Sequence, residues 1–181
     1  MGNNPHPYFN ITRKCAGVKG ENIMSDKIKV ISAANGRCVI NNRDLGIRRI
    51  WPGRGSVVIF TKEQIEGLMY DPAFSNMVNE GYLYIEDMEV KKEIGIEPED
   101  AETPTIILFD DKQLKRFWKD MPFAQFKVEL KSLKKAQIDS LARYAITHGD
   151  EGSIDKANYL SEISGYQILK GIEIEKQSKE V

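Results

Sequence analysis

The sequence has no long hydrophobic run, and it contains few cysteines and histidines. Its longest unbroken apolar stretches are VVIF at 57–60 and IILF at 106–109, which are far too short to span a bilayer. The first residues, MGNNPHPYFNITRKC, include no apolar segment of the length that a secretory signal needs. Cys15 and Cys38 have neither CxxC spacing nor partner histidines, so we expect free thiols in a reducing compartment. These features are typical of a soluble globular protein made in the cytoplasm.

The sequence also lacks the short motifs of common enzyme chemistry. It contains no GxGxxG or GxxxxGK[ST] loop for phosphate and no GxSxG around a nucleophilic serine. His148 lies near Asp150 and Glu151, but the helix dipole alone favours a cation at the C-terminal end of a helix. The acidic run EPEDAE at 97–102 lacks the alternating ligands and central glycine of a calcium loop. We therefore expect no catalytic residue, no cofactor and no metal.

The charges nearly balance, but they are unevenly distributed. Residues 1–60 contain ten Lys or Arg against three Asp or Glu, whereas residues 61–110 contain three against thirteen. This asymmetry predicts a basic and an acidic surface, which could attract a partner protein or another copy of the chain. Alternatively, the two blocks of charge face each other within one fold.

The sequence of the first half of the chain predicts a small α+β domain over residues 27–87. Alternating patterns predict a hairpin from 27–31 and 37–40, and a second strand pair from 45–51 and 56–60 around the turn PGRG. Helix-capping patterns predict two short helices, because Thr61 has Gln64 three positions later and Asp71 precedes Pro72. The two helices are predicted at 62–70 and 72–80, and a further strand is predicted at 82–87.

The remainder of the chain divides into an N-terminal arm, a linker and a helical domain. Residues 1–26 show no helical or strand period and are expected to form an extended arm. Residues 88–105 are acidic, contain two prolines and are interpreted as a linker. Residues 106–181 are predicted to form a mostly α-helical domain with its own apolar core, built from five short helices. The fold class expected is therefore α+β: a small mixed β-sheet domain with two short helices, followed by a helical domain.

The stretch IRRIWPGRG at 47–55 has two interpretations. In a nucleic-acid-binding loop, Arg48, Arg49 and Arg54 would contact phosphate while Trp51 stacks on a base. However, neighbouring strand residues point to opposite faces, so Arg48 and Arg49 cannot share one. Pro-Gly is a strong turn signal, and we favour a hairpin turn first and a contact surface second. The corresponding alternative function is a nucleic-acid-binding regulatory protein that uses this basic hairpin and the C-terminal helices.

The run GLMYDPAFSNMVNEGYLYIEDMEVKKEIGIEPEDAE at 67–102, followed by a small helical tail, resembles small virion proteins of tailed bacteriophages. The resemblance implies a non-enzymatic structural protein that binds capsid or neck proteins, with no catalytic residue to carry over. It would be made in the cytoplasm of the host bacterium and reside in the virion. Its partners would be other virion proteins and copies of itself, with nucleic acid as a second choice and no membrane.

The arm supplies the contacts expected with those partners. Tyr8 and Phe9 are the expected anchors, because large aromatic side chains bury the most apolar area per ordered residue. Arg13 and Lys14 would then lie against an acidic strip of a neighbouring copy, at residues 86–102. The complete set of predicted partner-binding residues is Tyr8, Phe9, Arg13, Lys14, Arg48, Arg49, Trp51 and Arg54.

Overall fold

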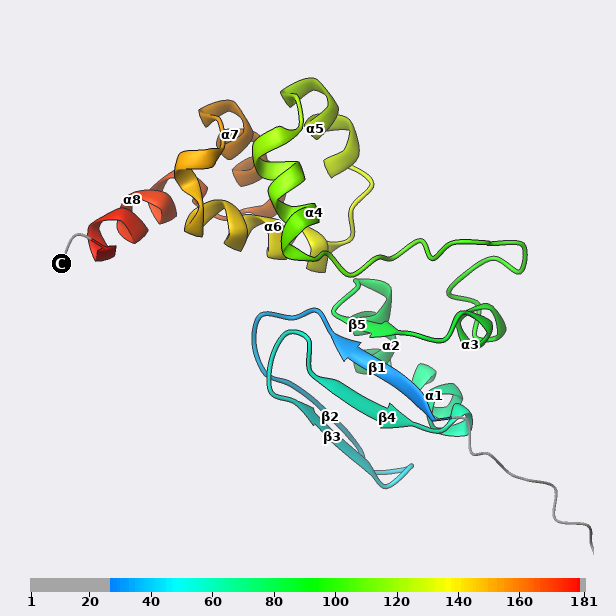
Figure 1. The fold of residues 1–181 in the computed structure, drawn as a ribbon. Helices are drawn as coiled ribbons and strands as arrows, with labels where there is room; N and C mark the ends of the chain where they lie inside the picture. Colours follow the sequence, from blue (N-terminus) through cyan, green and yellow to red (C-terminus); the bar gives the residue numbers. More distant parts are fainter. Residues whose placement is uncertain (1–26, 180–181) are drawn as a thin grey trace, which may run out of the picture.

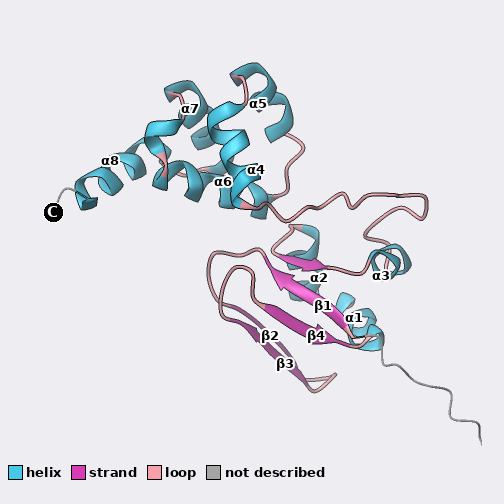
Figure 2. Ribbon diagram, in the orientation of Figure 1, coloured by secondary structure: helices cyan, strands magenta, loops and turns pink. Residues whose placement is uncertain are grey.

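The structure is a computed structural model that describes residues 27–179 of the 181-residue chain. It has the predicted α+β fold with a helical C-terminal part: Figure 1 shows the strands in the lower half of the view and a helical bundle above them, and Figure 2 marks strands and helices. The predictions for the arm, residues 1–26, lie outside the described residues. The N-terminal elements are β1 Ile28–Ser32, β2 Cys38–Asn42, β3 Ile47–Trp51, β4 Val57–Phe60, α1 Lys62–Met69, α2 Pro72–Asn79, β5 Leu83–Ile85 and α3 Met88–Glu93.

Strand pairing differs from the prediction. β1 pairs antiparallel with β4 and β5, which gives the sheet order β4-β1-β5, whereas β2 and β3 form a separate hairpin. The hairpin turn is at Arg43–Gly46, where Gly46 has a φ of 63° and donates its amide hydrogen to the carbonyl of Arg43. After β3, the PGRG segment turns back to β1, because the amide of Gly55 donates to the carbonyl of Ser32 at 2.7 Å. The two predicted hairpins are therefore wrong, and PGRG is a turn that connects the two sheets.

Trp51 holds the two sheets together in the first apolar core. Its indole Nε1 donates to the carbonyl of Val30 at 2.9 Å, and its ring stacks on Phe60 with 5.9 Å between centroids. A fully buried tryptophan needs such a partner for its N–H group. Helices α1 and α2 close the same core with Ile65, Leu68, Phe74 and Val78.

The ends of the two helices follow the predicted local signals. Thr61 and Gln64 form the expected capping box at α1, in which each side chain accepts from the backbone of the other. The carboxylate of Asp71 accepts from the amide of Ala73 and caps α2. Gly81 follows α2 with a φ of 80°, a left-handed conformation that glycine adopts without a steric penalty.

The range predicted as a linker, 88–105, is partly helical and partly packed. The carboxylate of Asp87 accepts from the amide of Val90 at 3.0 Å and caps α3, and Val90 is buried in the first core. Further along, the buried carboxylate of Glu97 accepts from both the amide and the hydroxyl of Thr105, at 2.8 and 2.6 Å. The linker prediction is corrected accordingly, because the first half of this range belongs to the N-terminal part.

The C-terminal part is the predicted helical unit. Asp110 and Gln113 form a capping box at its first helix, and Ser153 caps a later one. The helix that contains Ser164 ends at Gly165, which has a left-handed conformation. The elements are α4 Asp111–Lys115, a π-helical turn Arg116–Asp120, α5 Phe123–Leu130, α6 Lys135–Thr147, a 3-10 turn Gly149–Glu151, α7 Ile154–Ser164 and α8 Ile168–Lys179.

The buried apolar residues form two clusters, one in each part. The first ends at Val90, with Ile94 and Ile96 packed against it, and the second begins at Leu114. The parts nevertheless touch, because the amide of Ala136 near the start of α6 donates to the carbonyl of Glu80 at the end of α2, at 3.1 Å. This contact positions α6 beside the N-terminal part.

Candidate binding cleft

A cleft with a volume of about 360 Å³ lies between the two parts. Its N-terminal wall is the loop at 33–36, between β1 and β2, together with Tyr82. Its C-terminal wall is one face of α6, with Tyr166 from the connection between α7 and α8. Most of this lining is apolar, from alanines and Ile146. A concave, largely apolar site at a junction between two packed parts is a common location for ligands.

Tyr82 reaches across the cleft to Asp139 of α6. Gly81 turns the chain at the end of α2, after which the amide of Tyr82 donates to the carbonyl of Met77 at 2.8 Å. The phenol hydroxyl then donates to Asp139 Oδ2 at 2.5 Å.

Tyr166 lines the cleft together with the same carboxylate. Its pKa is raised, mainly by the negative charge of Asp139 and further by burial. The pKa of Tyr82 is raised more strongly, first by burial and then by its hydrogen bond to Asp139. Both phenols therefore remain protonated well above neutral pH, where they can donate hydrogen bonds to the carboxylate.

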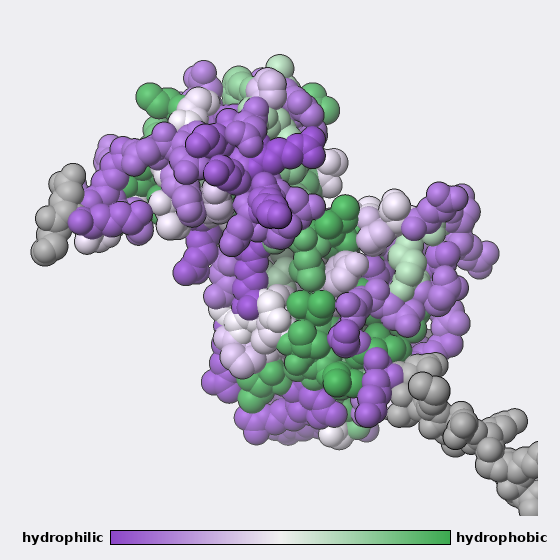
Figure 3. All heavy atoms as spheres, viewed as in Figure 1, coloured by the Kyte–Doolittle hydropathy of each residue, from purple (hydrophilic) through white to green (hydrophobic). Residues whose placement is uncertain are grey.

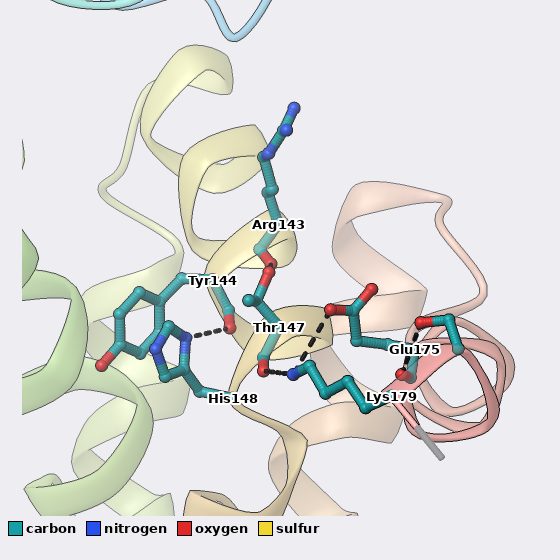
Figure 4. A network of polar contacts seen from close by, with 7 residues as sticks. Arg143, Tyr144, Thr147, His148, Glu175 and Lys179 are labelled. Atoms are coloured by element: carbon teal, nitrogen blue, oxygen red, sulfur yellow. Dashed lines mark hydrogen bonds and ion pairs between the residues drawn. The ribbon is translucent and has the colours of Figure 1, made fainter. Parts of the chain in front are cut away.

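Arg143 follows Asp139 by one helical turn and lines the same cleft. Within residues 27–179, its guanidinium has neither a hydrogen-bond nor an ion-pair partner. Figure 4 shows this side chain extending away from the contacts at the end of α6, where Lys179 donates to the carbonyl of Thr147 at 3.2 Å. The cleft thus contains one carboxylate and one guanidinium that are not paired with each other.

The predicted site residues at 48–54 do not form one surface. Arg49 lies over the ring of Phe60, 5.7 Å from its centroid, and donates to the carbonyl of Arg48. The guanidinium of Arg48 is on the opposite, exposed face of β3, as the alternation predicts. Arg54 donates to the carbonyl of Phe109 at 2.5 Å. This arrangement does not support the nucleic-acid interpretation, which needs the three cations together.

The structure also corrects the role expected of Trp51, which is fully buried and belongs to the core, where it offers no surface to a partner. The other predicted partner-binding residues, Tyr8, Phe9, Arg13 and Lys14, lie outside the described residues.

His148 ends α6 as expected and stacks on Tyr144, with 4.0 Å between ring centroids. In the described part of the chain, no group of three or more His, Cys, Asp or Glu could hold a metal ion.

Sequence reasoning did not find the cleft residues. Tyr82 and Asp139 are 57 positions apart, and only the contact between two packed parts brings them together.

Comparison of the chain with protein-family models, curated proteins and solved structures finds no match. Among residues 27–179, no helix is long and apolar enough to cross a membrane.

Proposed function

We propose that this protein is a non-enzymatic structural protein of a phage particle, and that its cleft holds a segment of another particle protein. The observation that carries the binding role is the cleft itself, which has apolar walls from both parts and one polar cluster around Asp139. Such a site buries apolar side chains of a ligand and fixes their orientation through a few polar groups. The phage particle is the setting that the resemblance to small virion proteins implies, a resemblance that spans residues 27–175.

Two further surfaces support a role in assembly. The face of the β4-β1-β5 sheet turned away from α1 and α2 exposes about half of the Val57 and Ile59 side chains, at 48% and 52%. Figure 3 shows hydrophobic residues gathered over this region of the molecule. Exposed apolar patches on folded proteins commonly mark protein–protein contacts. The acidic side chains of α3 and the loop after it are exposed as well, namely Glu89, Glu93, Glu99, Asp100 and Glu102.

Purified particles test the setting. We expect mass spectrometry of particles made by the genome that encodes this chain to detect the chain as a regular component. Its absence from those particles would contradict the proposal. A gel shift with DNA at low salt that weakens steeply with added salt would instead support the nucleic-acid-binding alternative.

Site-specific cross-linking tests the cleft as the binding surface. The photoreactive amino acid p-benzoylphenylalanine would replace Tyr166, which lines the cleft with 47% of its surface exposed. Tyr70, 90% exposed and outside this cleft, is the matched control position. We expect position 166 to cross-link to one particle protein that position 70 does not capture. The same product from both positions would argue against a specific cleft.

A further inference from the structure

We infer that the cleft selects a lysine side chain of the bound segment, whose ammonium group binds Asp139 beside the hydroxyl of Tyr82. This inference rests on the proposed function, in which the cleft holds a segment of a partner protein. Its basis is the hydrogen-bonded pair of Tyr82 and Asp139 in a largely apolar cleft.

The charge of Asp139 has no cationic partner in the described part of the chain. Tyr82 donates to its Oδ2 at 2.5 Å. This phenol satisfies part of the hydrogen-bonding capacity of the carboxylate, which accepts at about four lone-pair positions, but it does not neutralise its charge. A carboxylate that is half-buried among apolar groups binds a cation more strongly than a fully solvated one does.

The geometry favours an ammonium group over a planar guanidinium. An ammonium has three donors that point in different directions, and it can contact a carboxylate oxygen of Asp139 and the hydroxyl oxygen of Tyr82 at once, because these two oxygens lie 2.5 Å apart. The apolar lining, which includes Ala142 and Ile146, suits the four-carbon stem of a lysine. Arg143 lies at an exposed position one turn along α6, where water screens its repulsion of the incoming cation.

The ligand class can be measured on the full chain by NMR titration with a small probe, n-butylammonium chloride. Two molecules of similar size are the controls: n-butanol, which is neutral, and sodium butyrate, which is an anion. We expect n-butylammonium to shift the amide signals of residues around the cleft saturably, and to bind about ten-fold more tightly than n-butanol. Equal binding of n-butanol or sodium butyrate would overturn the inference.

Variants locate the charge that binds the probe. Asp139→Asn retains an acceptor for Tyr82 but removes the charge, and we expect about a ten-fold loss of affinity for n-butylammonium. Asp44→Asn, at an exposed position in the β2–β3 turn, is the matched control and should leave the affinity unchanged. An unchanged affinity in Asp139→Asn would also overturn the inference.

The two proposals can fail separately. If a particle protein cross-links at position 166 but n-butylammonium binding shows no dependence on Asp139, the ligand assignment is wrong while the structural role stands. If n-butylammonium binds selectively and particles lack the chain, the phage role is wrong while the cleft remains a site for alkylammonium groups.

Discussion

The ammonium of Lys156 lies 2.6 Å from the backbone oxygen of Trp118, inside the C-terminal core. It also donates to the carbonyl of Phe117 at 3.2 Å and lies 5.5 Å from the centroid of the Phe126 ring. Lys156 is in the first turn of α7, and its ammonium donates hydrogen bonds to carbonyl groups of the π-helical turn that continues α4. A buried lysine thus joins two helices of the bundle through backbone acceptors.

We expect Lys156→Met to lower the free energy of unfolding by about 2 kcal/mol, because it leaves buried carbonyl groups without a donor while the side-chain volume is nearly retained. Urea denaturation of the full chain measures the change. Lys170→Met, at an exposed position of α8, is the control and should change stability by less than about 0.5 kcal/mol. Equal effects of the two substitutions would show that the hydrogen bonds of Lys156 contribute little.

The raised pKa of Tyr82 predicts a loss of stability at alkaline pH. Because the folded-state pKa lies above the ordinary value of 10.0, the folded protein retains a proton that the unfolded chain loses. The contribution of Tyr82 is therefore fully present below about pH 10 and declines as the pH rises further.

Tyr82→Phe isolates this effect. At pH 7 we expect the variant to be less stable than the unmodified protein by about 1 kcal/mol, the value of a typical hydrogen bond. The stability difference should shrink between about pH 10 and 12, since only the unmodified protein has the Tyr82 proton to lose. Urea denaturation of both proteins at each pH measures this difference. The effects of all other titrating groups are the same in the two proteins and cancel in the difference. A difference that stays constant with pH would contradict the expectation.

Gly152 is packed against Trp118 so closely that no side chain fits. A Cβ at this position would lie 2.2 Å from Cε2 of Trp118, a fully buried side chain whose Nε1 donates to the carbonyl of His148. We expect Gly152→Ala to destabilise the protein by about 2–3 kcal/mol through overpacking. Gly36→Ala, where a Cβ meets nothing within 4 Å, is the control. Thermal unfolding of both variants gives the comparison, and a neutral Gly152→Ala would mean that the indole can move aside.

Limited proteolysis tests the division into two independently packed parts. We expect the first cleavage within 88–105. In the structure, the most accessible segment of this range lies between Pro98 and Pro104, beyond α3 and the first core, so the cleavage site should lie there. Mass spectrometry of early digestion products locates the cleavage sites. One protected fragment that spans 88–105 would contradict the prediction.

Features that depend on neighbours along the chain could be predicted from the sequence. The capping box at Thr61 needs only a partner three positions later, and the cap at Asp71 needs only the start of the helix that follows it; both are present. The alternation in β3 correctly predicted that Arg48 and Arg49 lie on opposite faces of the strand.

Features that depend on distant segments could not be predicted in this way. The pairing of β1 with β4 rather than with β2 leaves no local pattern in the sequence, and neither does the contact of Trp51 with Val30 of β1. The six-residue helix α3 is too short for its periodicity to stand out from an acidic sequence. The cleft depends on the docking of α6 against the end of α2, for which the sequence of neither helix carries a signal.

Because the two cores are separate and follow one another along the chain, the first core can fold before the second during translation. All residues of the first core, up to Ile96, are translated before residues 97–172, the 76 residues that lead to and complete the second core. At about 5–20 residues per second, the ribosome needs roughly 4–15 s to add those residues, which is long compared with the folding time of most small domains. The sheets therefore have time to assemble while the bundle is still being made. Tyr166 lies 70 positions beyond Ile96, so the nascent chain cannot engage a ligand through the complete cleft until the helical bundle has been translated as well.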